Sequence, residues 1–149
     1  MNKKDQIISA ALTLIVKNGI HATPMSAVAK QAGTGMGTIY NYFPTKEDLI
    51  NAIYVDIKLR EQNIFSDFND QLPLKTQFED NYRSLINFFT DHPNFFHFME
   101  QLNSSPIITE ESREIGYQSV QSTSMLLKKG IQDRVIKNIE TKEIMQFIG

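Results

Sequence analysis

The sequence contains no cysteine in its 149 residues. Without cysteine, neither a disulfide framework nor a thiolate metal site can form. The sequence has no run of about 18 apolar residues, which a membrane-spanning helix would need. Its first residues, MNKKDQIISAAL, lack the cleavage region of a signal peptide. We therefore expect a cytoplasmic protein.

Strand-like alternation of apolar and polar residues is missing too, as are internal repeats and low-complexity tracts. Hydrophobic residues make up 41% of the chain, so disorder is not expected. Apolar residues recur instead at three- and four-residue spacing, which is typical of amphipathic helices. The sequence therefore predicts an all-α protein, and its length allows one or two small domains with a real core.

Acidic residues are scarce at the N-terminus, although the whole chain has a net charge of −2. Residues 1–46 contain five lysines and one aspartate, a net charge of +4, whereas the remainder carries −6. Only the first segment therefore attracts phosphate, as expected of a nucleic-acid-binding head on an acidic body. The alternative is a chance cluster of solvated lysines.

Several helices follow from the apolar spacing and from glycine, proline and capping residues. The expected helices span residues 4–17, 24–32, 36–43, 45–68, 75–91, 94–103 and from 109 onward, with a last one over 131–148. Inward-facing residues in the late helices would be Ile115, Val120, Leu126, Leu127, Val135, Ile136, Ile139 and Ile144. Gly130 is expected to bend or end the helix that starts at 109.

The stretch from Thr23 to Lys46 has the spacing of a helix-turn-helix. Thr23 is expected to cap the first helix, and Gly33 to end it in the left-handed conformation. Ala29 supplies the small residue where two steeply crossing helices approach, and Ile39 an inward anchor from the second helix. The outer face of the second helix would then be free to enter a DNA major groove.

At these residues the chain resembles the N-terminal domain of the tetracycline-repressor (TetR) family. The segment AGTGMGTIYNYFPTKEDLI matches the family pattern of alanine-glycine, a turn, glycine-threonine-isoleucine-tyrosine, tyrosine-phenylalanine and lysine-glutamate. With the preceding helix, the resemblance covers about the first third of the chain. Gly35 and Met36 depart from the pattern, because serine or alanine and a basic residue are usual there.

The recognition helix offers residues for two kinds of DNA contact. Thr38 and Asn41 are suited to hydrogen bonds with base edges, and Met36 to a thymine methyl group. The resemblance implies that Tyr40, Tyr42 and Lys46 contact phosphates, which position a protein without reading sequence. The alternative for the tyrosines is packing within the head. The complete expected interface is Thr23, Thr34, Gly35, Met36, Gly37, Thr38, Tyr40, Asn41, Tyr42 and Lys46, with Thr23 acting through its backbone N–H.

A cluster of aromatic residues further along is the best candidate for a ligand pocket. Its members are Phe89, Phe95, Phe96, Phe98, Met99 and Tyr117. Apolar cavities with a few polar groups are typical of small-molecule sites. The alternative is that these residues form ordinary core. We name no ligand and expect no cofactor.

Metal binding and catalysis are not expected. His92 and His97 lie five residues apart across Pro93, which is poor spacing for two ligands on one helical face. No carboxylate pair and no nucleophile motif accompanies them.

The sequence thus predicts a regulator with a DNA-binding domain over 1–46 and a helical ligand-binding domain over 47–149. The resemblance implies a homodimer that represses from a palindromic operator and is released by a small hydrophobic effector. One alternative has the same fold and DNA binding but acts through a protein partner without a small molecule. A second is an enzyme in which the helix-turn-helix is incidental. TetR-like proteins dimerise through further C-terminal helices, so we expect this chain either to be truncated or to dimerise through another surface.

Overall fold

The computed structural model describes residues 1–65, 71–119 and 121. These residues form helices, and no strand occurs in the described part of the chain, which confirms the all-α prediction. The elements are α1 (Lys3–Asn18), α2 (Met25–Ala32), α3 (Met36–Tyr42), α4 (Lys46–Phe65), α5 (Leu74–Asp91), α6 (Pro93–Leu102) and α7 (Glu110–Ser119). The expectations for 131–148, for Val120, Leu126, Leu127 and Gly130, and for the end of the fourth helix at 68 lie outside the described residues.

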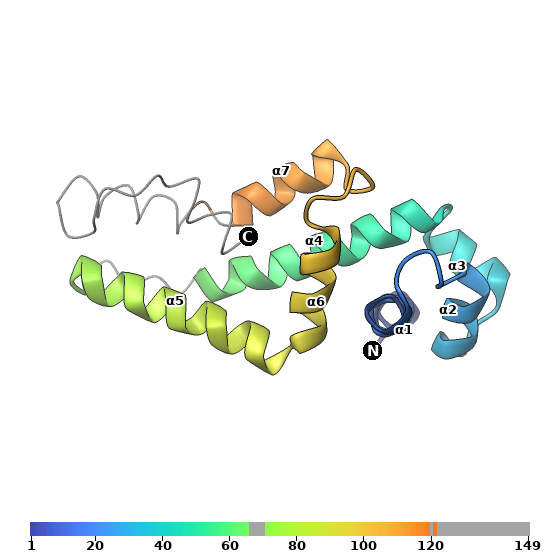
Figure 1. Ribbon diagram of the computed structural model, residues 1–149, viewed down its shortest axis with the longest axis horizontal. Helices are drawn as coiled ribbons and strands as arrows, with labels where there is room; N and C mark the ends of the chain where they lie inside the picture. The colour runs from blue at the N-terminus through green and yellow to red at the C-terminus, as the bar shows by residue number, and fades with distance from the viewer. Residues whose placement is uncertain (66–70, 120, 122–149) are drawn as a thin grey trace.

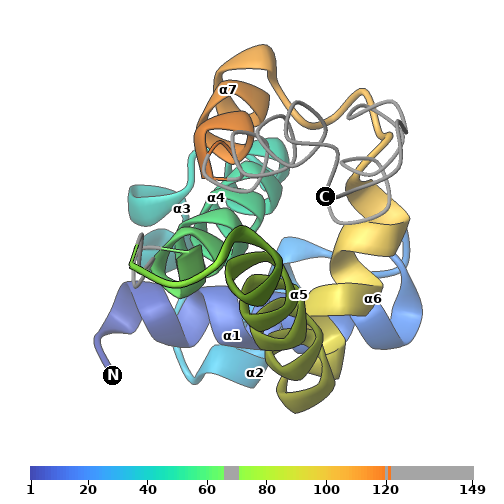
Figure 2. The ribbon, with the colours of Figure 1, turned by 90° about the vertical axis from the view of Figure 1, so that its left-hand side faces the viewer.

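The long helix α4 connects the two ends of the molecule (Figure 1). Helices α1, α2 and α3 gather at one end, and α5 returns antiparallel to α4 at the other. Viewed along the molecule, α1 crosses beneath α4 and α6, while α7 lies on α4 (Figure 2). The head and the rest of the described chain are therefore joined by packing as well as by the chain.

Local signals explain where the first and fourth helices begin. The Asn2 side chain accepts a hydrogen bond from the N–H of Asp5 at 2.8 Å. At α4, the Thr45 hydroxyl accepts from the N–H of Asp48 at 3.1 Å, and the Asp48 carboxylate accepts from the N–H of Thr45 at 3.1 Å. This reciprocal pair is a capping box, and it confirms Thr45 as the predicted cap.

The apolar core is continuous between the head and α6. The predicted stripe of α4, namely Leu49, Ile50, Ile53, Tyr54 and Ile57, is buried along its length. Ile7, Ala11 and Ile15 of α1 pack into the same cluster, together with Phe98 of α6 and Ile108 of the α6–α7 loop. Because these residues share one cluster, the position of α6 is coupled to that of the head.

Helix α7 approaches α4 closely at Gly116. A Cβ added there would lie 2.8 Å from the Tyr54 hydroxyl oxygen and 3.2 Å from Cγ of Lys58. Glycine at this position therefore lets the two backbones approach over the Tyr54 ring.

We expect Gly116→Ala to destabilise the protein, because overpacking costs about 1–3 kcal/mol against a helix-propensity gain of about 1 kcal/mol. Gly37→Ala is the matched control, since nothing lies within 4 Å of its added Cβ. Denaturant unfolding should show Gly116→Ala to be the less stable of the two, and Tyr54→Phe should relieve part of the loss. Equal stability of the two alanine variants would contradict this packing.

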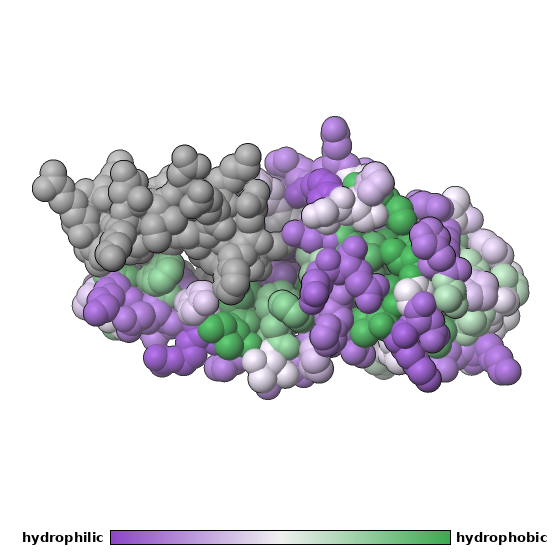
Figure 3. Space-filling view, viewed as in Figure 1, coloured by the Kyte–Doolittle hydropathy of each residue, from purple (hydrophilic) through white to green (hydrophobic). Residues whose placement is uncertain are grey.

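Helix α5 has aromatic and aliphatic residues at helical spacing, but few of them are buried. Leu85 is buried, whereas Tyr82 and Ile86 are 38% and 47% exposed. Apolar surface appears between polar side chains on the face seen in Figure 3. None of the helices in the described ranges is long and apolar enough to cross a membrane.

Candidate nucleic-acid interface

The turn between α2 and α3 is built by Gly33. This residue ends α2 with φ 69° and ψ 36°, the left-handed conformation that the sequence predicted. Its N–H donates to the Lys30 carbonyl at 3.2 Å, and the N–H of Thr34 donates to the Ala29 carbonyl at 2.9 Å. A Cβ at Gly33 would meet nothing within 4 Å, so the backbone conformation alone favours glycine.

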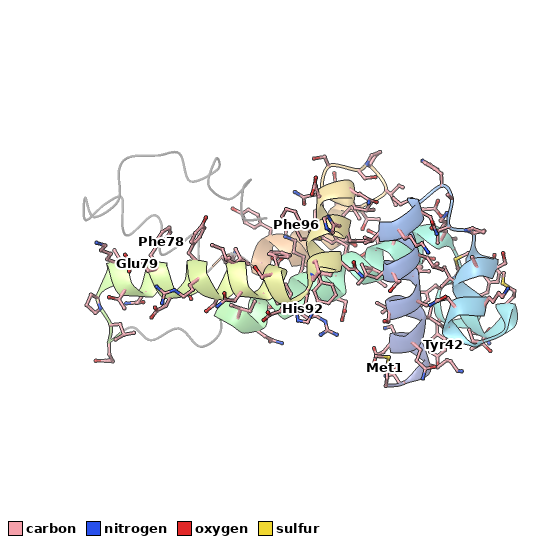
Figure 4. All side chains as sticks on the ribbon, turned by 60° about the horizontal axis from the view of Figure 1, so that its bottom comes forward. Met1, Tyr42, Phe78, Glu79, His92 and Phe96 are labelled. Atoms are coloured by element: carbon pink, nitrogen blue, oxygen red, sulfur yellow. The ribbon has the colours of Figure 1, made fainter. Side chains whose placement is uncertain are left out.

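Helix α3 has one buried and one exposed face. Ile39 is 0% exposed, and Phe43, directly after the helix, is 3% exposed. Beside these buried residues, Met36 is 38%, Tyr40 45% and Tyr42 46% exposed. Large apolar and aromatic side chains are thus held in solvent at the end of the molecule, where Figure 4 shows Tyr42.

The smaller predicted contact residues lie around the same face. Gly35, Gly37 and Asn41 are exposed, and Thr34 and Thr38 are partly buried. Gly35 is the N-cap residue of α3, and no side chain caps this helix. A Cβ added at Gly35 or at Gly37 would have no atom within 4 Å. The surface at the start of α3 is therefore open, and a nucleic-acid backbone can approach it closely.

The predicted role of Thr23 as the cap of α2 is wrong. Pro24 occupies the capping position, and no side chain caps the helix. Thr23 is 1% exposed, and its hydroxyl donates to the Gly19 carbonyl at 2.7 Å. Its N–H donates to the Ile20 carbonyl at 3.2 Å, so it is not available to a phosphate. Thr23 fixes the turn between α1 and α2 instead.

Lys46 has an intramolecular partner in this structure. It is partly buried, and its ammonium donates a hydrogen bond to the Ile20 carbonyl in the α1–α2 turn. The side chain thus bridges the start of α4 and the turn that Thr23 also fixes. A phosphate contact by Lys46 remains a prediction, and it would be made from this tethered position.

The five lysines of residues 1–46 keep their charge without a carboxylate partner. Within the described residues, none of Lys3, Lys4, Lys17, Lys30 and Lys46 forms an ion pair with a carboxylate. The charge of the head is therefore not neutralised locally, which favours contact with a polyanion.

Asn51 of α4 links the head to the α6–α7 loop. Its amide nitrogen donates to the carbonyls of Glu47 at 2.8 Å and Ile107 at 3.0 Å, and its amide oxygen accepts from the N–H of Thr109 at 2.9 Å. On the far side of this loop, Arg113 of α7 donates to two loop carbonyls, those of Asn103 at 2.6 Å and Ser105 at 2.7 Å. The loop is therefore held to α4 and to α7 at once.

We expect Asn51→Asp to loosen this link, because a carboxylate cannot donate to the Ile107 carbonyl and that hydrogen bond is lost. The cost should be about 1–3 kcal/mol in unfolding free energy. Since the chain has no cysteine, spin labels placed at Ser26→Cys and Ser84→Cys report the distance between the head and α5. Asn51→Asp should broaden that distance distribution, while Asn87→Asp on the exposed side of α5 should not. An unchanged distribution would mean that Asn51 does not position the head.

The predicted pocket residues do not form one buried group. Phe98 and Met99 are 0% and 6% exposed and belong to the core that includes the head. Phe89 and Phe95 are partly buried. Phe96 and Tyr117 are 49% and 61% exposed, so their inclusion as pocket-lining residues is not supported by their burial. Phe96 packs edge-on against Phe89, with ring centroids 5.9 Å apart, and lies on α6 as Figure 4 shows.

His92 takes part in aromatic packing at the junction of α5 and α6 (Figure 4). Its ring stacks on Phe95 at 4.7 Å between centroids and lies 5.3 Å from Phe88. The guanidinium of Arg60 lies 5.6 Å from the centre of the Phe95 ring. No group of three or more metal-ligating side chains occurs among the residues that the structure describes.

Comparisons with known proteins agree with this geometry. The pattern of the family described as bacterial regulatory proteins, tetR family, matches residues 7–53. The HTH-type transcriptional regulator YhgD of Bacillus subtilis is 28% identical over 141 residues, which are 94% of this chain and 69% of that protein. The N-terminal domain of the chain, over residues 7–53, is that of the TetR family of bacterial regulatory proteins.

Other relatives are similar to this chain over shorter stretches, and solved structures are similar to it in fold. The fatty acid metabolism regulator protein of Bacillus subtilis is 49% identical over 49 residues, which are 33% of this chain but only 25% of that protein. A TetR family transcription regulator from Marinobacter aquaeolei VT8 has the same fold, with a TM-score of 0.86 at 20% identity over 98% of this chain and 77% of that one. The structure of FadR from Bacillus subtilis in complex with stearoyl-CoA gives a TM-score of 0.73 at 26% identity, over 97% of this chain and 80% of that one. The relatives named here are regulators, which confirms the expectation that the chain is not an enzyme.

The residues that connect the head to the remainder of this TetR-family protein were not found from the sequence. Asn51, Arg113 and Gly116 each act on partners that are distant in the chain or on the backbone of a loop. Asn51 and Thr109 are 58 residues apart, and no local spacing marks such a pair. Only Asn51, a polar residue beside the apolar stripe of α4, gives a weak signal.

Proposed function

We propose that this protein is a DNA-binding transcriptional repressor that acts as a homodimer on a palindromic operator and is released by a small, largely apolar effector. The observation that carries the proposal is the two-sided α3, with Ile39 buried beneath it and Met36, Tyr40 and Tyr42 in solvent. One head exposes few side chains, so a dimer reading two half-sites is needed for useful specificity. Such a protein would work in the cytoplasm, where the DNA lies.

In this proposal, residues 1–46 bind DNA and residues 47–149 bind the effector. Asn41 and Thr38 hydrogen-bond base edges, and Met36 contacts a thymine methyl group. Tyr40, Tyr42 and Lys46 contact phosphates, while Thr34, Gly35 and Gly37 let the backbone approach the DNA. Support comes from the exposure of Met36, Tyr40, Asn41 and Tyr42 and from the lysines of the head, which form no ion pair with a described carboxylate.

The effector is proposed to act through α7 and the α6–α7 loop. Arg113 and Asn51 join α7 to the loop and the loop to α4 by hydrogen bonds of 2.6–3.0 Å. A ligand that favours another position of α7 would therefore also favour another position of the head, and thereby shift the population away from the DNA-bound spacing. The relative FadR of Bacillus subtilis was solved with stearoyl-CoA, which supports an effector with a long apolar part.

Asn41→Ala tests the assignment of base reading. We expect it to weaken binding to the selected operator by about 1–3 kcal/mol and to leave binding to random DNA nearly unchanged. Lys46→Ala is the contrasting variant, expected to weaken binding to both DNAs and to reduce the salt slope by about one unit. Because Lys46 also bonds the α1–α2 turn, thermal unfolding is measured alongside. Equal losses on both DNAs for Asn41→Ala would refute its base-reading role.

A further inference from the structure

Lys46 is held by a main-chain oxygen and not by a carboxylate. Its ammonium donates to the Ile20 carbonyl in the turn between α1 and α2. The nearby carboxylate of Asp48 accepts instead from the N–H of Thr45 at 3.1 Å and from its hydroxyl at 2.9 Å. No ion pair among the described residues includes Lys46. Because a carbonyl carries no net charge, the side chain of Lys46 is oriented without losing its positive charge.

The carbonyl of Ile20 is itself fixed by Thr23. The N–H of Thr23 donates to this carbonyl at 3.2 Å. The Thr23 hydroxyl donates to the Gly19 carbonyl at 2.7 Å and lies 3.3 Å from the Leu14 carbonyl in the last part of α1. Thr23 is 1% exposed, so water does not take the place of these bonds. The end of α1, the turn and the start of α4 are thus joined through one buried threonine and one lysine.

The ammonium of Lys46 keeps donors for a further partner. It has three N–H donors, and the Ile20 carbonyl takes one of them. The side chain is only partly buried, and it follows α3 by four residues, since α3 ends at the exposed Tyr42. A mobile lysine loses rotamer freedom when it binds a partner, whereas a tethered lysine has already lost part of it on folding. Lys46 is therefore a cation oriented in advance just after the recognition helix.

We propose that Thr23 and the Ile20 carbonyl are positioning groups for DNA binding, because they hold the Lys46 ammonium where it meets a phosphate. This inference rests on the proposed function, since the phosphate contact of Lys46 belongs to it. Thr23 itself touches no DNA and acts through the turn and the lysine. This role replaces the phosphate contact that the sequence predicted for its N–H.

The test measures binding of the full chain to a random duplex of about 30 base pairs across a salt series, because phosphate contacts do not depend on sequence. Lys46→Met removes the ammonium and keeps the apolar stem. We expect it to lower the salt slope by about one unit per bound head, which weakens binding about 8-fold at about 0.1 M salt. Thr23→Val, which loses only the hydroxyl function, should produce most of both changes although Lys46 is present. The double variant should then bind much as Lys46→Met does, because the two residues act as one unit.

Two threonine variants serve as controls. Thr23→Ser keeps the hydroxyl and should retain the full slope. Thr13→Val removes an exposed hydroxyl of α1, which donates to the Ser9 carbonyl at 3.0 Å, and should also leave the slope unchanged. A full slope in Thr23→Val beside a reduced slope in Lys46→Met would overturn the inference and leave the proposed function intact. A full slope in Lys46→Met would overturn the phosphate contact of the proposed function, and the inference with it.

A backbone ester covers the case in which Thr23→Val does not fold. Replacing the peptide bond between Ile20 and His21 by an ester weakens the Ile20 carbonyl as an acceptor and keeps every side chain. The N–H of His21, which is lost, donates no backbone hydrogen bond in the described part of the chain. The ester protein should show the reduced slope that is expected of Thr23→Val. A full slope in the ester protein, beside a reduced one in Lys46→Met, would overturn the inference.

Nuclear magnetic relaxation of the lysine Cε groups tests the tether without any DNA. In the free protein, Cε of Lys46 should be more rigid than Cε of the exposed Lys30, and its signal is assigned by its loss in Lys46→Met. Thr23→Val or the ester should make Cε of Lys46 as mobile as that of Lys30. Equal mobility of the two groups in the unmodified protein would overturn the inference, whatever the DNA measurements show for the proposed function.

Discussion

Phe98→Ala is expected to lower the free energy of unfolding by about 3–5 kcal/mol, as is typical when a large buried aromatic residue is removed. Phe98 is 0% exposed and belongs to the core shared by α1, α4 and α6. A domain of this size has about 5–15 kcal/mol of stability in total, so the loss is a large fraction of it. Denaturant unfolding followed by circular dichroism measures the change.

Phe96→Ala is the matched control, two residues away on the same helix. Phe96 is 49% exposed, so its loss should cost much less. If the core is continuous, the Phe98 variant also unfolds in a single transition, because the head and α6 lose their contacts together. A similar cost for both variants, or a separate unfolding step for the head, would contradict the continuous core.

Lys58→Met is expected to cost about 3–5 kcal/mol near neutral pH, because it leaves Glu61 as an uncompensated buried charge. Lys58 and Glu61 are 3% and 0% exposed, and Nζ of Lys58 lies 3.4 Å from Oε2 of Glu61. The pKa of Glu61 is already raised above its ordinary value of 4.5, and burial is the main cause. Removing Lys58 takes away the nearby cation that lowers this pKa, so the pKa rises further.

The sign of the pH dependence follows from the raised pKa. Between the ordinary value and the raised one, the folded protein binds more protons at Glu61 than the unfolded chain does, so stability falls as the pH rises. The deficit of Lys58→Met should therefore shrink as the pH is lowered toward about 4.5. Lys75→Met is the control, since Lys75 is 77% exposed and lies 4.0 Å from Glu79. It should change stability by less than about 0.5 kcal/mol, and a pH-independent deficit in Lys58→Met would contradict the account.

Helix boundaries that depend on neighbouring residues could be predicted from the sequence. Gly33 ends α2 and Thr45 caps α4 as expected, because each feature depends on residues at most four positions apart. The stripe of α4 is buried as its spacing predicted. The exception is Thr23, whose hydroxyl bonds Gly19 across a turn, in a conformation that the sequence does not specify.

Features that depend on contacts between distant segments could not be predicted. The aromatic residues of α5 and α6 have the same spacing whether they face a core or solvent, so Phe98 and Phe96 differ only through the elements packed around them. The link from Asn51 to the α6–α7 loop and the close approach at Gly116 depend on how helices pack, which local spacing does not determine. For the same reason, the buried oxygen Oε1 of Glu61, which accepts no hydrogen bond, is visible only in the folded chain.

The central claim is that the exposed face of α3 reads a specific DNA sequence. The most direct test is selection from a genomic DNA fragment library across a salt series, with the mass of the protein in solution measured alongside. The account predicts enrichment of one palindromic site, bound by a dimer with a steep salt dependence. Weak binding without sequence preference, by a protein that stays dimeric in the same solutions, would contradict it.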